Sequence, residues 1–168
     1  MASSTADGVE TPNSTTAGGS ISETASTAGI GLLSDNIPWP GRTYRIQHRT
    51  SGRLITLVEG RLQLQLPETT KGAGGWYWVC VDRNGWLGFR SPVSGTYMGH
   101  DKRGRIWAQY SHHESHESFC VRRHPEGGYV ILVKHGEGRE LWQMALDEES
   151  GILVEKKKSD DQWLFELV

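Results

Sequence analysis

One short segment gathers most of the residue types that could do chemistry. Residues 111–118 read Ser-His-His-Glu-Ser-His-Glu-Ser, so the imidazoles of His112, His113 and His116 stand among two carboxylates. Imidazole and carboxylate are ligands for transition metals, and histidine also serves as a general acid or base. We predict a polar surface loop with no metal. A metal site and a pH-responsive or acid–base patch remain as alternatives.

Aromatic and charged residues just before this segment could bind a ligand. Side chains alternate between the two faces of a strand, so Trp107 should point away from the core if Ile106 points into it. An outward tryptophan near Tyr110 could stack on a sugar or an aromatic ligand. We predict ligand binding by Trp107, Tyr110, Arg105 and Asp101. Other basic residues could add a partner surface: Arg42, Arg45, Arg49, Arg53, Arg61, Lys102 and Arg103.

Several catalytic signatures are missing from the chain. It has no Gly-x-x-x-x-Gly-Lys phosphate loop, no Gly-x-Ser-x-Gly elbow and no His-Glu-x-x-His motif. We therefore expect a non-catalytic binding module without a cofactor. The alternative is an enzyme of metabolite biosynthesis. It would use a pocket lined by Trp107, Tyr110 and the three histidines for acid–base chemistry or cyclisation of a small hydrophobic metabolite.

The elements that must position these residues form three repeats. Aromatic-led strands begin at Tyr44, Trp86 and Tyr129, which are spaced 42 and 43 residues apart. In each unit three further short strands follow, bounded by Gly, Ser, Asn and Asp. The units cover about residues 43–84, 85–127 and 128–168. Twelve strands in three units predict an all-β, closed antiparallel structure, because closure removes exposed sheet edges.

Tryptophan and cysteine positions predict part of the core. Trp78 and Trp163 lie at equivalent points of the last strand in their units. Cys80 and Cys120 also look equivalent, with Phe165 near that point of the third unit. A position that accepts phenylalanine is a core position, and free cysteine behaves as a small buried hydrophobe. We expect both cysteines in the core.

The first 37 residues differ from the rest. Of the first 30 residues, 21 are Ser, Thr, Ala or Gly, which predicts a disordered tail before a folded domain at 38–168. The tail lacks the basic start and apolar core of a secretion signal. With only 2 cysteines, the chain suits a reducing compartment, so we expect a cytoplasmic protein. The net charge of −2 and the lack of a long apolar run argue against nucleic-acid and membrane partners.

The second unit resembles a known family. It reads Gly-Thr-Tyr-Met-Gly-His-Asp over 95–101, Gly-Arg-Ile-Trp-Ala over 104–108 and Glu-Ser-Phe over 117–119. These segments are similar to the turn and strand motifs of fascin-like, actin-crosslinking-type β-trefoils, and more distantly to ricin-B-type lectins. The chain also resembles small proteins of filamentous fungi. The resemblance implies a β-trefoil that binds either a glycan or a protein, with actin as one candidate protein partner. The Gln-x-Trp signature of ricin-B-type lectins is absent.

Overall fold

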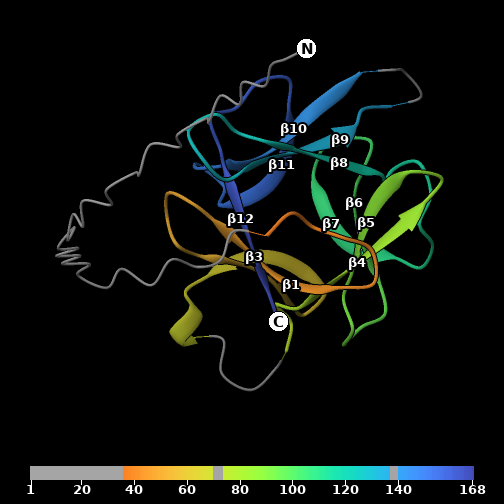
Figure 1. Ribbon diagram of the computed structural model, residues 1–168, viewed down its shortest axis with the longest axis horizontal. Coiled ribbons are helices and arrows are strands. Elements are labelled where there is room, and N and C mark those ends of the chain that lie inside the picture. The colour runs from red at the N-terminus through yellow and green to blue at the C-terminus, as the bar shows by residue number, and fades with distance from the viewer. Residues whose placement is uncertain (1–35, 70–73, 137–139) are drawn as a thin grey trace, which may run out of the picture. The chain divides into compact units, whose positions relative to one another are not determined.

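The computed structural model describes residues 36–69, 74–136 and 140–168 (Figure 1). The described residues form twelve strands and a short 3-10 helix, η1. The bounds are β1 (Thr43–His48), β2 (Leu54–Val58), β3 (Arg61–Gln65), η1 (Pro67–Thr69), β4 (Trp78–Arg83), β5 (Trp86–Arg90), β6 (Tyr97–His100), β7 (Ile106–Tyr110), β8 (Phe119–Arg123), β9 (Tyr129–Lys134), β10 (Leu141–Asp147), β11 (Ile152–Lys156) and β12 (Trp163–Leu167). The predicted tail, residues 1–37, lies outside the described residues apart from Asn36 and Ile37.

Six of the strands close into an antiparallel ring. Going round it, β1 pairs with β4, β4 with β5, β5 with β8, β8 with β9, β9 with β12, and β12 with β1. The other six strands form three hairpins, β2–β3, β6–β7 and β10–β11. The second strands of these hairpins, β3, β7 and β11, contact one another. Each unit supplies four consecutive strands, and the strands are labelled in chain order in Figure 1. The chain is an all-β β-trefoil, as predicted.

Two hairpin turns show why the strands reverse where they do. Asn84 and Gly85 join β4 to β5 with φ of 55° and 83°, and Glu59 and Gly60 join β2 to β3 with φ of 49° and 79°. Positive φ at both central residues is the two-residue hairpin turn whose twist matches that of the strands. In the second turn Val58 pairs directly with Arg61.

The core contains the two tryptophans that the sequence placed there. Trp78 and Trp163 are fully buried. Each indole N–H donates to a backbone carbonyl of a hairpin, Trp78 to Ile55 at 2.9 Å and Trp163 to Met144 at 3.2 Å. A buried indole needs such an acceptor, since an unpaired N–H away from water costs free energy. These bonds join the hairpins to the ring of strands.

The predicted equivalence of the two cysteines is wrong by one residue. Phe119 is fully buried in β8, as Trp78 is in β4. In β4, the residue two positions after Trp78 is Cys80, which is buried. In β8, the residue two positions after Phe119 is Val121, which packs against the core. Cys120 therefore lies on the other face of its strand and is half-buried, because a one-residue slip changes the face. Both thiols are free.

Candidate functional site

A hollow of about 340 Å³ lies where the three hairpins meet. Its floor is formed by three residues at equivalent positions of β3, β7 and β11, namely Leu62, Ile106 and Leu153, all buried. Their neighbours in the sequence form the rim together with the turn at residues 150–151; these neighbours are Arg61, Gln63, Arg105, Trp107 and Ile152. Strand alternation explains the arrangement: when the middle residue points into the core, its two neighbours point outward. The hollow thus has an apolar floor and a rim that mixes basic and polar side chains with Trp107 and Ile152.

The second unit places two of the predicted ligand-binding residues, Arg105 and Trp107, at this rim, and a third, Asp101, is hydrogen-bonded to both. Arg105 Nε and Nη2 lie 2.8 and 2.7 Å from Asp101 Oδ2, and the Trp107 indole N–H donates to the same oxygen at 3.2 Å. The Arg105 guanidinium carbon lies 5.1 Å from the centre of the Trp107 ring, a distance suited to a cation–π contact. Both Arg105 and Trp107 line the hollow. The prediction that Trp107 points away from the core is confirmed, since Trp107 is only partly buried.

Asp101 is the centre of this cluster. Its Oδ1 accepts the backbone N–H groups of Arg103 at 2.8 Å and Arg105 at 3.0 Å. Burial on its own would raise the pKa of the Asp101 carboxyl. The hydrogen bonds from Arg105, Arg103 and the Trp107 indole outweigh burial and lower that pKa to about 2. The carboxylate is therefore ionised at neutral pH, and it fixes the orientation of both Arg105 and Trp107.

Strand β11 contacts the turn that carries Asp101 and stabilises it. Glu155 donates its backbone N–H to the carbonyl of Gly104 at 2.7 Å. Its carboxylate oxygen Oε1 lies 3.0 Å from His135 Nδ1 and 3.7 Å from His100 Nδ1. Gly104 has φ of 76°, and a Cβ there would lie 2.9 Å from Glu155 Cγ. A side chain at residue 104 would therefore adopt a strained backbone conformation and would have to displace the Glu155 side chain.

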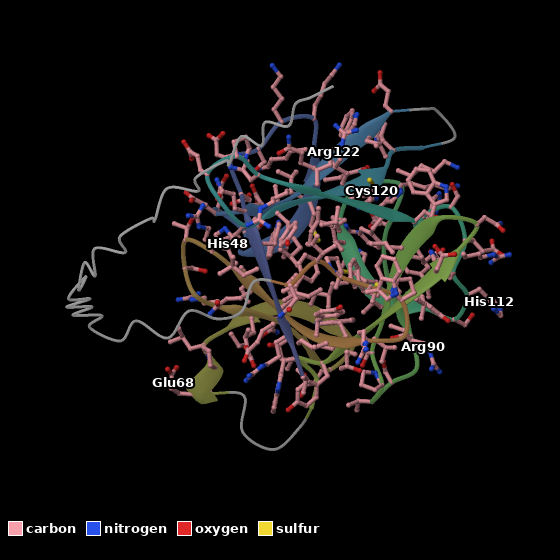
Figure 2. All side chains as sticks on the ribbon, viewed as in Figure 1. His48, Glu68, Arg90, His112, Cys120 and Arg122 are labelled. Carbon is pink, nitrogen blue, oxygen red and sulfur yellow. The ribbon has the colours of Figure 1, made fainter. Side chains whose placement is uncertain are left out.

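The remaining predicted site residues do not reach this hollow. Tyr110 lines a separate hollow of about 170 Å³ with His112, and burial raises the pKa of its hydroxyl. Figure 2 shows His112 at the periphery of the domain. His113 is buried against Gly88 and stacks on Tyr97 with ring centres 5.8 Å apart. Burial, with help from the charge of Arg83, lowers the pKa of His113.

The third histidine of the segment, His116, lies beside His100. The ring of His116 lies 4.7 Å from that of His100. The three histidines therefore lie in different surroundings and do not line one common pocket. Over residues 36–69, 74–136 and 140–168, no three side chains among His, Cys, Asp and Glu are grouped to hold a metal ion. Catalysis by His112, His113 and His116 stays a prediction.

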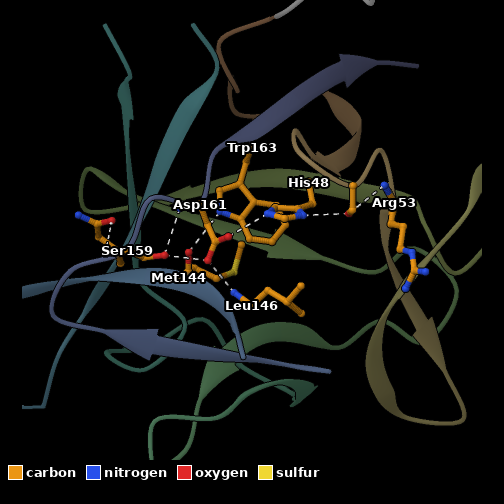
Figure 3. Close-up of polar contacts among 9 residues, drawn as sticks. His48, Arg53, Met144, Leu146, Ser159, Asp161 and Trp163 are labelled. Atoms are coloured by element: carbon orange, nitrogen blue, oxygen red, sulfur yellow. Dashed lines mark hydrogen bonds and ion pairs between the residues drawn. The ribbon is translucent and has the colours of Figure 1, made fainter. Parts of the chain in front are cut away.

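A second polar cluster was not anticipated from the sequence (Figure 3). His48 lies 2.9 Å from Ser51 Oγ through Nδ1 and 2.9 Å from Asp161 Oδ1 through Nε2. Oδ2 of Asp161 accepts the N–H of Leu146 at 2.9 Å and the hydroxyl of Ser159 at 2.7 Å. Although burial would raise the pKa of Asp161, these bonds lower it. Because both nitrogens of the buried His48 ring face protein groups, we interpret the cluster as a structural link between β1 and the third unit.

Sequence reasoning missed the hollow because its walls come from three distant segments. Arg61, Ser150 and Ile152 all line it, and none lies near Trp107 in the sequence. The signal that could have found it is positional: Arg61, Arg105 and Ile152 each precede the buried residue of their hairpin's second strand. Aligning the three hairpins would have brought these residues to one place.

Comparisons with known proteins agree on the fold. No protein-family model and no curated protein sequence matches this chain. Among solved structures, a ricin B-like lectin from Macrolepiota procera, in complex with lactose, superposes with a TM-score of 0.63 at 16% identity, over 78% of this chain and 99% of the lectin. The designed three-fold symmetric protein ThreeFoil gives 0.59 at 17% identity, over 75% and 97%.

A larger protein contains a similar domain. An endo-β-galactosidase from Clostridium perfringens that releases GlcNAcα1-4Gal superposes with a TM-score of 0.64 at 13% identity. The match covers 76% of this chain and 32% of the enzyme, so this chain spans about a third of that protein's length. At such identities the likeness shows the β-trefoil fold. No helix among the described residues is long and apolar enough to cross a membrane.

Proposed function

We propose that this chain is a non-catalytic glycan-binding module whose ligand occupies the hollow between the three hairpins. The observation that carries the proposal is the pair of Arg105 and Trp107 at the rim, both held by Asp101. An indole face offers a surface for the C–H groups of a sugar ring, and the N–H groups of the Arg105 guanidinium that do not bond Asp101 can donate to hydroxyls. The hollow's volume of about 340 Å³ suits a small ligand.

The cluster is organised before any ligand arrives. Asp101 holds both Arg105 and the Trp107 indole through hydrogen bonds, and the Gly104 turn is fixed against Glu155. Side chains that are already ordered lose less conformational entropy on binding, which favours affinity in a small site. The lectin that superposes on this chain was solved with lactose, which agrees with a sugar as the ligand class. Actin as a partner, the fascin-like relationship and a cytoplasmic location stay predictions of the sequence.

Binding to a glycan array, followed by calorimetry on the sugars retained, tests the proposal. Trp107→Ala should weaken binding at least about fivefold, since loss of stacking on an aromatic ring costs about 1 kcal/mol or more. Trp39→Ala is the matched control, because Trp39 is 69% exposed and does not line the hollow. Thermal unfolding of both variants separates lost binding from lost folding. Retention of no glycan, or equal loss in both variants, contradicts the proposal.

A further inference from the structure

The hollow carries a positive charge that no described residue neutralises. Among the residues that the structure describes, the charged side chains lining the hollow are Arg61 and Arg105, and none of the lining residues is a carboxylate. Arg105 is paired with Asp101. The guanidinium of Arg61 makes no hydrogen bond or ion pair within the described part of the chain, and Arg61 is exposed.

The pseudo-symmetry of the three units explains why Arg61 lacks a partner. Asp101 and Arg105 face each other across the β6–β7 turn, where the Asp101 N–H donates to the Arg105 carbonyl at 2.9 Å. Val58 and Arg61 face each other across the β2–β3 turn. The first unit therefore has a valine where the second unit has the aspartate that pairs with its arginine. The third unit has Ile152 in place of an arginine, opposite Asp147.

We infer that the ligand of the hollow is an acidic saccharide, one whose sugar carries a carboxylate. This inference rests on the proposed function and specifies its ligand. In this arrangement the Trp107 face takes the ring, and Arg61, which lines the same hollow from β3, takes the carboxylate. Guanidinium and carboxylate match in geometry and form charge-assisted hydrogen bonds. A neutral sugar would leave the Arg61 guanidinium facing only water.

Matched pairs of sugars test the inference. Galactose and galacturonate, glucose and glucuronate, and mannose and mannuronate differ only at C6, which is a CH2OH group in one and a carboxylate in the other. Affinities measured by calorimetry or NMR titration should favour at least one acid over its neutral partner by about fivefold to tenfold, the range for one partly exposed charge-assisted bond. Raising the salt concentration should reduce that preference.

Two variants assign the preference to Arg61. Arg61→Gln removes the charge, and Val58→Asp supplies the carboxylate that the second unit has at this position. Each should remove the preference for the acid over its neutral partner. Arg53→Gln is the control, because Arg53 is exposed and does not line the hollow; it should leave the preference intact.

The possible results distinguish the inference of an acidic ligand from the proposal of a glycan-binding module. Neutral sugars that bind as tightly as their acids, with binding still lost in Trp107→Ala, overturn the acidic ligand and leave the glycan module standing. A preference for the acid that survives in both Arg61→Gln and Val58→Asp also overturns it. Absence of binding by any sugar, in these pairs and on the glycan array, overturns both.

Discussion

Replacing Asp101 by asparagine tests the organisation of the site. The Asp101 carboxyl has a pKa of about 2, compared with its ordinary value of 3.8. One pKa unit corresponds to about 1.4 kcal/mol, so the ionised carboxylate stabilises the folded state by about 2 kcal/mol at neutral pH. The Asp101 side chain is 19% exposed and that of its partner Arg105 is 39% exposed, so solvent screens their ion pair in part, and the figure of about 2 kcal/mol allows for this. Asp101→Asn should lower the free energy of unfolding by about 2 kcal/mol and the melting temperature by roughly 5–10 °C.

The pH dependence has a defined sign. Because the pKa of Asp101 is lower in the folded state, its contribution is complete above about pH 5 and decreases as the pH falls from about 4 towards 2. Denaturant unfolding of wild type and Asp101→Asn should therefore differ most at pH 7 and converge near pH 2. Asp160→Asn is the control, since Asp160 is exposed and its carboxylate makes no hydrogen bond within the described residues. Equal stability of wild type and Asp101→Asn at pH 7 would refute the reasoning.

Two further predictions concern the turn and the thiols. In denaturant unfolding, Gly104→Ala should destabilise the domain by at least about 1 kcal/mol more than Gly85→Ala. Both glycines have positive φ, but of the two only residue 104 would place its Cβ in contact with another side chain. Equal losses of stability in the two variants would contradict that contact. Cys80 should resist a thiol reagent at pH 8 until the domain unfolds, because burial, with a smaller effect of the Asp82 charge, raises the pKa of its thiol to about 12. Half-buried Cys120 should react first, and rapid labelling of Cys80 in a Cys120→Ser variant would count against the structure.

The fold was predictable from the sequence because it repeats. Aromatic-led strands at Tyr44, Trp86 and Tyr129 set the period, and clean alternation made Trp78 and Trp163 recognisable as core residues. The same alternation placed Trp107 outward. These are local signals, since a strand with one buried face imposes a period of two on its own sequence.

The site was predictable only in part. Asp101, Arg105 and Trp107 lie within seven residues on one hairpin, so local reasoning could group them. Tyr110, three residues after Trp107, lines a different hollow. A bulge between Tyr97 and Met98 leaves one extra residue in β7, so Tyr110 pairs with Tyr97 while Trp107 pairs with Gly99, and the spacing along the sequence alone did not show this. The third-strand residues that complete the hollow come from segments about 45 residues apart, and only the packing of the hairpins brings them together.

The most direct test of the central claim is to observe the tryptophans while a sugar binds. The chain has 7 tryptophans, and each indole N–H gives its own signal in an NMR spectrum of the 15N-labelled protein. On titration with the three pairs of neutral and acidic sugars, the Trp107 indole signal should shift most, because its N–H is held at the rim of the hollow by Asp101. The signal of exposed Trp39 should stay in place. Saturable shifts centred on other tryptophans, with Trp107 unmoved, would show that the hollow between the hairpins is not the binding site.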